Sequence, residues 1–399
     1  MRIVFVCAAD FNAPSEKQAL GYAQELVRRG HSVLISIGGD LDTVRTENAM
    51  GLPALQVVRH RLQALGGRLG SPELQVARSF RPTLIHSFSP RLPVLTAAAA
   101  YARATGAPVF VHYEDDEWSI ARGNPDQPLH RRVARPVLRQ LGRVRPQAWP
   151  FQSPASERWL ASGARGIDAL TPALAEYVTQ RVGRPVDVLL PVTPVAQETA
   201  PPPFNLKPDD APVVMYTGAV FGLHINDFRL GLEAVALVQR EGRPVRFVHV
   251  GTLAARFDPD VLVKDAGLRP GTARFLGHFP FAAMPGLLRA ADILLQPGHP
   301  SDFNRFRLPS KLQSYLASGT PTVTFAVGFG ELLEDRREVL KTYTGDPREL
   351  AARLTELLDD QQLRETLSRE APIVAQRLFD PRRNTDALLA HYRRCLNSS

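Results

Sequence analysis

The sequence has few cysteines, which form disulfides and ligate zinc, and it lacks the long apolar runs that form membrane spans. It has two cysteines in 399 residues, Cys7 in the first apolar segment and Cys395 near the C-terminus, which argues against a disulfide scaffold or a zinc site. No apolar run approaches the roughly 20 residues that cross a bilayer. The start Met1–Cys7 predicts a buried strand rather than a signal peptide, because no small-residue cleavage site accompanies it. We therefore expect a cytoplasmic protein.

Lysine is scarce as well, although the net charge is +8. The basic residues are nearly all arginine, and the lysines are Lys17, Lys207, Lys264, Lys311 and Lys341. A positive net charge favours binding to an acidic partner such as nucleic acid, an anionic membrane surface or an anionic substrate. The chain has no nucleic-acid-binding motif and no interleaving of basic and aromatic residues, so we expect no nucleic-acid partner.

Short apolar runs alternate with helix-like segments in both halves of the chain. This alternation predicts parallel sheets buried on both faces, and hence an α/β protein with two Rossmann-like, doubly wound domains. The strand candidates are Ile3–Cys7, His31–Ile37, Thr83–Ser87, Pro108–Tyr113, Ile167–Thr171, Val186–Leu190, Val213–Thr217, Val245–Val250, Thr272–Leu276, Asp292–Leu295 and Thr320–Phe325. The helix candidates are a segment that starts at the capping-box spacing of Ser15 and Gln18 and ends at Gly30, then Leu95–Thr105, Asp227–Glu241, Phe281–Ala290 and Arg348–Asp359, with further helix from Gln361 onward.

A proline-rich stretch divides the two halves. Residues 191–203 lack periodicity and predict an extended linker. This places one domain at residues 1–195 and the other at residues 204–379, with a last helix at 380–399 that we expect to pack back on the first domain. Doubly wound domains bind their ligands at the carboxyl ends of the strands, so the cleft side of each domain is the expected site.

The segment from Asn304 to Phe325 carries the clearest functional signal. It predicts a basic loop, a short helix and a strand, with Gly319 as the left-handed helix stop. Ser310 and Gln313 have the spacing of a capping box, which predicts the helix start at Ser310. The start of a helix offers free N–H groups and a partial positive charge to a ligand.

Three basic residues, Arg305, Arg307 and Lys311, stand at this helix start. Together with the helix N-terminus they suit an anion, most naturally a diphosphate, and so predict nucleotide-sugar binding. The alternative is the solvated basic face of an ordinary α/β unit. Lys311 favours the anion site, because a cation in the first helical turn opposes the macrodipole and costs stability unless an anion offsets it.

An ordered series of short motifs follows along the second half. It comprises Tyr216-Thr-Gly218, Val248-His-Val-Gly251, Phe275-Leu-Gly277, Met284–Leu288, Ala291–Leu295, Pro309–Leu312, Tyr315–Pro321 and Gly328–Leu332. In this order the chain resembles the retaining GT-B glycosyltransferases of family 4. The resemblance implies transfer of a sugar from a nucleotide-diphosphate sugar to an acceptor hydroxyl with retention, without a metal or other cofactor. It also implies a bacterial role in polysaccharide, glycolipid or glycoconjugate synthesis, with a sugar, lipid-linked or protein acceptor.

The resemblance further implies which residues act in the C-terminal, nucleotide-sugar-binding domain. Arg305, Arg307 and Lys311 would stabilise the departing diphosphate, and the leaving phosphate itself would accept the proton of the acceptor. The residues implied to bind the donor are Gly218, Phe221, Gly222, His224, Gly277, His278, Phe279, Leu308, Pro309, Ser310 and Ser314.

The chain departs from the family at four positions. Phe306 and Ser314 stand where members carry two glutamates, and Ala219 and Asn226 stand where many members carry an arginine and a lysine. Either the three cations replace these contacts, at roughly 1.5–3 kcal/mol for each charge-assisted hydrogen bond, or donor binding has been lost. In the second case the chain is a non-catalytic GT-B partner of another transferase. A GT-B epimerase or phosphorylase is a third interpretation.

An acidic segment follows the strand that ends at Tyr113, on the acceptor-side domain. Glu114 stands where the family often has a sugar-binding histidine, and Asp115 matches its aspartate. We interpret the two carboxylates as binding sugar hydroxyls or positioning the attacking hydroxyl. The alternatives are a divalent ion held by Asp115 and Glu117, or acids that are merely solvated.

Other candidates on this domain have weaker signals. Acceptor contacts are expected from Asn12, Ser15, Lys17 and Asp116, whereas His86 and His112 are expected to be packed rather than catalytic. Four arginines recur at helical spacing, and they predict either a solvated helix face or peripheral contact with the inner face of the membrane, which would suit a lipid-linked acceptor. These are Arg132, Arg135, Arg139 and Arg143.

Overall fold

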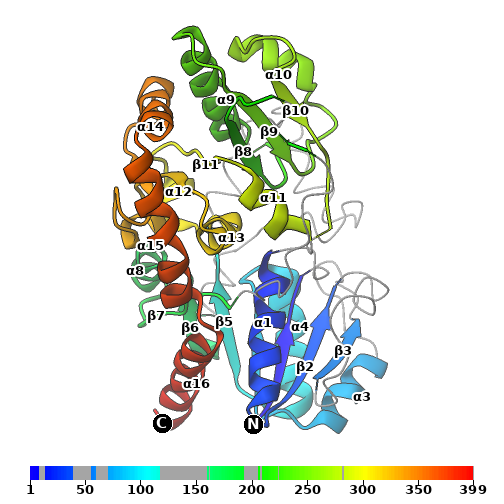
Figure 1. Cartoon of the computed structure of the whole chain (residues 1–399). Helices are drawn as coiled ribbons and strands as arrows, with labels where there is room; N and C mark the ends of the chain where they lie inside the picture. The colour runs from blue at the N-terminus through cyan, green and yellow to red at the C-terminus, as the bar shows by residue number, and fades with distance from the viewer. Residues whose placement is uncertain are drawn as a thin grey trace. The chain divides into compact units, whose positions relative to one another are not determined.

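The computed structural model describes residues 1–8, 14–38, 55–59, 71–116, 160, 162–192, 205–206, 209–222, 224–280 and 283–398. The chain forms two compact units, one of Met1–Pro194 with Phe379–Ser399 and one of Val195–Leu378. Each unit holds a sheet with helices packed on it (Figure 1). None of the described helices is long and apolar enough to cross a membrane. Most of the linker expected at 191–203 lies outside the described residues.

The first unit is built on a seven-stranded parallel sheet with the strand order β3-β2-β1-β4-β5-β6-β7. Its strands are β1 (Arg2–Val6), β2 (Ser32–Ile37), β3 (Leu55–Arg59), β4 (Leu84–Ser87), β5 (Val109–Tyr113), β6 (Ala164–Ala169) and β7 (Asp187–Val188). The apolar run of β1 is fully buried from Ile3 to Val6. Burial on both faces explains why such strands read as continuous apolar runs rather than as alternating patterns.

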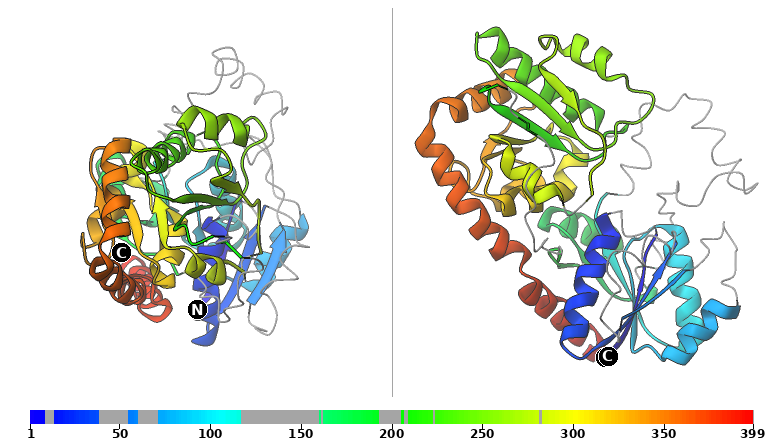
Figure 2. Two further views of the ribbon diagram at one scale, coloured as in Figure 1. Left: turned by 45° about the horizontal axis from the view of Figure 1, so that its top comes forward. Right: turned by 45° about the vertical axis from the view of Figure 1, so that its right-hand side comes forward.

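Helices cover both faces of this sheet. They are α1 (Pro14–Arg28), α3 (Ser71–Phe80), α4 (Leu92–Thr105), α8 (Pro172–Val182) and α16 (Pro381–Asn397). In the right-hand view of Figure 2 the blue α1 and the red α16 lie on one side of the sheet and the cyan α4 lies on the other. From α16, the buried Tyr392 packs edge-on against Phe110 of β5, with ring centroids 4.9 Å apart. The C-terminal helix is therefore part of the first unit's core.

The second unit is built on a six-stranded parallel sheet with the order β10-β9-β8-β11-β12-β13. Its strands are β8 (Val213–Thr217), β9 (Arg246–Val250), β10 (Ala273–Phe275), β11 (Ile293–Gln296), β12 (Thr322–Phe325) and β13 (Leu340–Thr342). Its helices are α9 (Ile225–Arg240), α10 (Pro259–Ala266), α11 (Met284–Ala290), α12 (Asp302–Phe306), α13 (Ser310–Ser318), the 3-10 helix η3 (Gly328–Leu332), α14 (Pro347–Asp359) and α15 (Gln361–Phe379).

Two apolar layers sandwich the second sheet. On one face Phe228 of α9 and Leu354 of α14 are buried with Tyr216 of β8. On the other face Leu287 of α11 and Tyr315 of α13 form a separate buried cluster with strand residues. The predicted fold class, an α/β protein with two doubly wound parallel sheets, is confirmed.

Each sheet has one point where the order of the strands reverses. In the second unit it lies between β8 and β11, which are neighbours although β9 and β10 separate them in the sequence. Doubly wound folds bind ligands just outside the carboxyl ends of the strands at this point. The loops after β8 and β11 are therefore the expected ligand site of this unit.

Several elements have no clear signal in the sequence. The three-residue β13 and the five-residue α12 are too short to show a period, and β3 is a second unpredicted strand. Both strands form at sheet edges by pairing, as Val323 does with Leu340 and Val33 with Leu55. Tertiary pairing, rather than local propensity, decides such elements.

A glycine contact in the first unit gives a test of this packing. Gly21 of α1 faces the carbonyl oxygen of Val192, which would lie 2.2 Å from a Cβ atom at position 21. We expect Gly21→Ala to lower the free energy of unfolding by about 1–3 kcal/mol, because α1 or the Val192 backbone must move. Calorimetry of the full chain measures this, with Gln24→Ala on the same helix as a control expected within about 0.5 kcal/mol. Equal melting of Gly21→Ala and wild type would contradict the packing.

Candidate functional site

The loops after β8 and β9 approach each other through two glycines. Gly218 has a φ of 104° and Gly251 a φ of 146°, in the region that side chains rarely adopt. A Cβ atom on Gly251 would lie 2.3 Å from the carbonyl oxygen of Gly218. That same oxygen lies 2.9 Å from Nε2 of His249. The backbone after β8 is thus held in a fixed path at the switch point.

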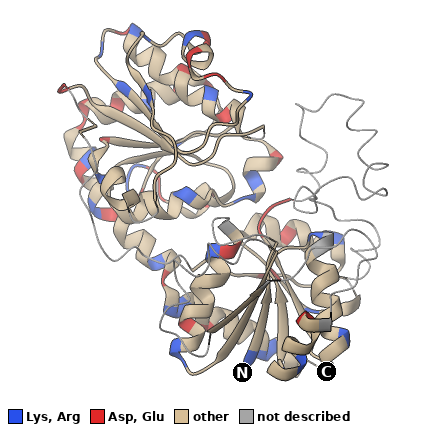
Figure 3. Cartoon of the chain, turned by 90° about the vertical axis from the view of Figure 1, so that its right-hand side faces the viewer, with Lys and Arg blue, Asp and Glu red and all other residues tan. Residues whose placement is uncertain are grey.

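Charged residues elsewhere in the described structure are mostly mixed in sign. Figure 3 shows basic and acidic positions interspersed along the helices. Many form ion pairs, such as Arg377 with Glu338 at 2.8 Å and Arg337 with Glu334 at 3.0 Å. A cation that lacks such a partner is therefore informative.

Lys311 is such a cation. It is half-buried in the first turn of α13, and its Nζ lies 3.5 Å from the ring centroid of Tyr216. A Cβ atom on Gly218 would lie 3.3 Å from its Cε, so the glycine makes room for the lysine. Among the described residues no carboxylate forms an ion pair with it. Burial lowers the pKa of Lys311 well below its ordinary value, the charge of Arg307 lowers it further, and Asp227 opposes both effects.

Arg307 is buried and already paired. It donates from Nη2 to Oδ2 of Asp227 at 3.3 Å and from Nε to Oδ1 of Asn304 at 2.8 Å. Its guanidinium lies over the ring of Phe303, 4.3 Å from the centroid. Asp227 offsets its charge, so Arg307 is in part a structural cation.

Arg305 differs from the other two predicted cations because it is exposed on α12. Its guanidinium lies 5.4 Å from the ring centroid of Phe306. The segment predicted as a basic loop is thus partly helical. The structure brings Lys311 and Arg307 close enough to influence each other, while Arg305 is at the surface.

The predicted capping box at the start of α13 is wrong. Pro309 is the N-cap residue and makes no side-chain cap, while Ser310 is the first helical residue and is exposed. Proline at this place fixes an extended entry into the helix and cannot donate a hydrogen bond. The first turn of α13 therefore has no side-chain cap, although the N–H of Leu312 donates to the carbonyl oxygen of Pro309 at 2.9 Å. The predicted stop is confirmed, since Gly319 ends the helix with a φ of 74°.

The loop after β8 adds an imidazole beside these cations. His224 is half-buried at the start of α9, and its ring lies 4.6 Å from that of the exposed Phe221. Its buried Nδ1 has no hydrogen-bond partner among the described residues. Burial and the charges of Arg307 and Lys311 lower the pKa of His224 to about 3, so the ring is neutral. It can offer a hydrogen bond without adding charge.

The other predicted donor residues fall into two groups. Gly222, Leu308 and Pro309 are buried, and Ser314 is half-buried one turn into α13. Gly277 and His278 are exposed in the loop after β10, where Gly277 has a φ of 71°.

Phe279, by contrast, is partly buried against the core beside α11, so its ring is engaged in packing.

Glu114 of the first unit lies directly after β5 in a largely buried position. The hydroxyl of Ser15 donates to its carboxylate, and Nε2 of His112 lies 3.9 Å from its Oε1. Burial raises the pKa of Glu114 to about 7, although His112 and Ser15 act against this. Its neighbour Asp115 is half-buried, Asp116 is buried, and Lys17 on α1 is half-buried.

Several predictions concern residues outside the described ranges. Asn12, Glu117 and the arginines at 132, 135, 139 and 143 all fall there. The proposed acid pair of Asp115 and Glu117, the acceptor contact of Asn12 and the membrane-facing helix therefore stay predictions.

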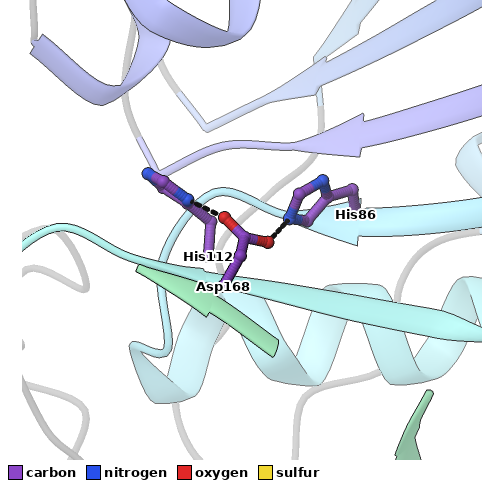
Figure 4. A group of neighbouring side chains, drawn as sticks. All are labelled: His86, His112 and Asp168. Carbon is purple, nitrogen blue, oxygen red and sulfur yellow. Dashed lines mark hydrogen bonds and ion pairs between the residues drawn. The ribbon is translucent and has the colours of Figure 1, made fainter. Parts of the chain in front are cut away.

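A buried cluster in the first unit was not predicted. Asp168 of β6 is fully buried between His112 of β5 and His86 of β4 (Figure 4). His112 binds Oδ1 through Nδ1, and Nε2 of His86 lies 3.0 Å from Oδ2. The outer nitrogens also have neighbours, the hydroxyl of Tyr392 at 2.7 Å from His86 and the amide of Gln18 at 3.1 Å from His112. An aspartate inside the apolar run 167–171 was the one available signal.

Among the described residues of this unit, two groups have metal-ligand chemistry, these three side chains and the set of Asp187, His391 and Cys395. Each oxygen of Asp168 faces a different imidazole nitrogen, so bridging protons account for both contacts without an ion between them. Burial opposes ionisation of Asp168, but His112 and His86 outweigh it and hold the pKa of this carboxyl below its usual range. The same charge raises the pKa of His112 despite its burial, whereas burial dominates at His86 and lowers its pKa.

A third histidine extends the cluster to the C-terminal helix. Nε2 of His391 lies 3.7 Å from Oδ2 of Asp168, and its Nδ1 binds the carboxylate of Asp187, which also binds Arg394. Burial alone would lower the pKa of His391, but the hydrogen bond to Asp187, with smaller contributions from Cys395 and Asp168, raises it to about 9. The charge on His391 therefore stabilises the docking of α16.

Comparison with protein families matches the two units separately. Residues 211–360 match the family model described as Glycosyl transferases group 1, and residues 15–193 match the Glycosyl transferase 4-like domain. One match falls in each of the two sheets described above, in the order of a GT-B protein. Each unit thus matches a glycosyltransferase domain family, and together they give the chain the domain order of a GT-B protein.

The chain is similar to curated proteins from two Streptomyces species. It is 29% identical over 265 residues to the 2-deoxystreptamine glucosyltransferase of Streptomyces kanamyceticus, covering 61% of this chain and 64% of the relative. It is 28% identical over 342 residues to the 2-deoxystreptamine N-acetyl-D-glucosaminyltransferase of Streptomyces fradiae, covering 79% and 77%. The first match spans slightly less than two thirds of that relative's length.

Solved structures share the fold of this chain over nearly its whole length. HepE from Anabaena, solved in complex with UDP and glucose, has a TM-score of 0.69 at 18% identity and covers 98% of this chain and 99% of that one. The sucrose-phosphate synthase of Thermosynechococcus elongatus has a TM-score of 0.68 at 15% identity, with 100% of both chains covered. At this identity the likeness concerns the fold.

The pKa of His391 makes the stability of the protein depend on pH. A histidine whose pKa is higher folded than unfolded stabilises the fold while it is protonated. The effect is complete below the unfolded pKa of about 6.5 and is lost as the pH rises through the folded pKa, which is about 9. We expect unfolding free energy to fall by up to about 3 kcal/mol between these pH values.

The variant His391→Gln should flatten this dependence. Melting temperatures of the full chain from pH 6 to 9 measure it, with the exposed His278→Gln as a control that keeps the wild-type slope. An unchanged slope in His391→Gln would show that this histidine does not carry the effect.

Proposed function

We propose that the chain is a retaining, metal-independent glycosyltransferase that transfers a sugar from a nucleoside-diphosphate sugar to an acceptor hydroxyl. The observation that carries the proposal is Lys311, a half-buried lysine without a described carboxylate partner, at the uncapped start of α13 and next to the switch point of the sheet. Such a position suits a diphosphate, which would supply the missing negative charge.

The donor side of the reaction follows from this placement. The diphosphate lies at the first turn of α13, with Lys311 as the direct cation and the N–H groups of that turn as further donors. Neutral His224 supplies a hydrogen bond from the loop after β8. A half-buried Ser314 one turn into the helix can donate to a ribose hydroxyl in place of the glutamate that the family usually has there.

The proposed chemistry uses the leaving group as the base. The bond from the anomeric carbon to the phosphate oxygen breaks, and its electron pair goes to the diphosphate. The acceptor oxygen bonds to the same face of the sugar and gives its proton to the leaving phosphate oxygen. Lys311 stabilises the charge that develops on that phosphate, which is the kind of electrostatic contribution that is usually largest.

Similar proteins inform the choice of substrates. Structures of Anabaena HepE contain UDP, UDP with glucose, or UDP-glucose, which favours a uridine donor here. Two relatives are named for 2-deoxystreptamine, an acceptor that carries amines. We therefore propose an amine-bearing aminocyclitol or amino sugar as the acceptor, in preference to a polysaccharide or lipid-linked one. The carboxylates of Glu114, Asp115 and Asp116 suit such a cation.

The variant Lys311→Ala tests the donor assignment. We expect kcat to fall about 100- to 1000-fold, since removal of one donor to a developing anion costs about that much. The melting temperature should stay close to that of wild type, because the partial burial of the Lys311 ammonium costs free energy and does not stabilise the fold. The exposed Lys264→Ala in α10 is the matched control. Turnover of Lys311→Ala at the wild-type level would refute the role of this lysine.

A non-catalytic GT-B protein is the second candidate, because Ala219, Phe306 and Ser314 depart from the family motif. A thermal-shift panel of UDP, GDP, ADP and their sugars separates the two. A nucleotide that binds the folded state raises the melting temperature. At one hundred times its Kd it adds about 2.7 kcal/mol to the free energy of unfolding. The absence of any shift at millimolar concentration would favour the non-catalytic protein.

The acceptor assignment makes the reaction depend on pH. Glu114 has a pKa of about 7, so it ionises as the pH rises through neutrality, while an amine like that of lysine stays charged. We expect the KM for an amine-bearing acceptor to fall from pH 6 to pH 8. In Glu114→Gln the KM should stay about 10- to 100-fold above the wild-type value at pH 8, from the loss of one charge-assisted contact.

The exposed Glu176→Gln on α8 is the control for this experiment and should behave as wild type. A KM that Glu114→Gln leaves unchanged at both pH values would remove Glu114 from the acceptor site.

A further inference from the structure

A buried acid stands at the centre of the contacts around the proposed donor site. Asp227 lies in the first turn of α9 and is 5% exposed. A carboxylate near a helix start is favoured by the helix dipole. Although burial opposes its ionisation, hydrogen bonds from His299 and Asn304 and the charge of Arg307 lower the pKa of Asp227, so it is ionised at neutral pH.

Both oxygens of this carboxylate accept two contacts each. Oδ1 accepts from the backbone N–H of His299 at 3.1 Å and lies 2.9 Å from its Nδ1. Oδ2 accepts from Nδ2 of Asn304 at 3.1 Å and from Nη2 of Arg307 at 3.3 Å. The amide of Asn304 in turn links Arg307 and the carbonyl of His299, at 2.8 and 2.9 Å.

These contacts fix the path of the chain from β11 to α13. His299 lies three residues after β11 ends, Asn304 lies in α12, and Arg307 lies three residues before α13 begins. A five-residue helix such as α12 has little stability of its own. Asp227 therefore holds, from a neighbouring helix, the segment that sets where α13 starts.

The same carboxylate balances the local charge. The charge of Arg307 lowers the pKa of Lys311, and Asp227, which forms an ion pair with Arg307, acts on Lys311 in the opposite direction. Among the described residues, His224, His249 and Tyr216 are further titratable groups that act on or contact Lys311. Burial lowers the pKa of both histidines and raises that of the tyrosine, so all three are neutral near pH 7.

We propose that Asp227 is a positioning residue for donor binding, which holds Arg307 and the entrance of α13 in place and so keeps Lys311 charged and aimed at the diphosphate. The proposal rests on the proposed function. Asp227 itself does not contact the donor.

The isosteric Asp227→Asn is the test, with UDP as the probe and calorimetric titration of the full chain as the measurement. We expect the Kd for UDP to rise at least about tenfold, since one partner of a buried charge pair is lost. Asp209→Asn is the matched control, because Asp209 also pairs with an arginine, Arg246, but at an exposed position of the same unit. It should keep the wild-type Kd.

The pH dependence of the Kd separates positioning from simple structural support. Protonated Lys311 binds the diphosphate, so affinity falls as the pH rises through its pKa. Without the carboxylate, Arg307 is unbalanced and lowers that pKa further. The midpoint of the loss in affinity should therefore move to lower pH in Asp227→Asn, and Asp227→Glu should move it back toward the wild-type value.

Each outcome of these titrations supports or contradicts the positioning role of Asp227. A weaker Kd with an unchanged midpoint, or a wild-type Kd, overturns the positioning role while the proposed function stands. If Asp227→Asn melts before titration is possible, Asp227→Glu gives the same decision, because restored affinity with a wild-type midpoint supports the role and lost affinity contradicts it. If the wild-type chain binds no nucleotide, the proposed function fails and the positioning role fails with it.

Discussion

The burial of a lysine charge at the start of α13 is the constraint around which the second unit is organised. Lys311 is placed over Tyr216, close to Gly218 and near the buried Arg307, and none of these supplies a negative charge. The acid that acts on it, Asp227, is already paired with Arg307, and a half-buried ammonium without a counter-charge of its own is costly. An ordinary α/β fold gains nothing from such a residue. The presence of Lys311 at this position is explained if a bound ligand supplies the counter-charge.

Other features of the unit fit the same requirement. Glycines at 218 and 251 let the loops after β8 and β9 approach each other closely, and Pro309 leaves the first turn of α13 without a side-chain cap. The switch point between β8 and β11 brings these segments to one edge of the sheet. Backbone donors, a helix dipole and a cation thus meet where a doubly wound sheet binds its ligand.

The first unit shows a different use of buried charge. Asp168 is surrounded by His86, His112 and His391, and the carboxylate and imidazoles compensate one another without a ligand. This cluster joins three strands to α16, the last helix of the chain, and so closes the unit. Glu114 lies next to it, where burial leaves an acid that titrates near neutrality at the carboxyl end of β5.

The sequence was sufficient for the fold class because the strands are buried on both faces and appear as continuous apolar runs. It was also sufficient for the end of α13, since Gly319 adopts the left-handed conformation that glycine accepts more readily than other residues. It could not show the capping of α13, because Ser310 and Gln313 have the spacing of a capping box while Pro309 takes the cap position. It could not separate Arg305 from Arg307, which are two residues apart but differ in burial through the contact with Asp227.

The histidine cluster was missed for a related reason. His86, His112, Asp168 and His391 are distant in the chain, and each alone resembles a packed side chain. Only the sheet order, which makes β4, β5 and β6 neighbours, brings them together. Long-range pairing of this kind has no local signature, in contrast to the apolar runs and the glycine stop.

The most direct test of the central claim is a crystal structure of the full chain with UDP. The claim predicts a phosphate oxygen about 2.7–2.9 Å from Nζ of Lys311, together with hydrogen bonds from the first-turn N–H groups of α13. A nucleotide bound elsewhere, or a diphosphate at α13 with Lys311 out of contact, would contradict it.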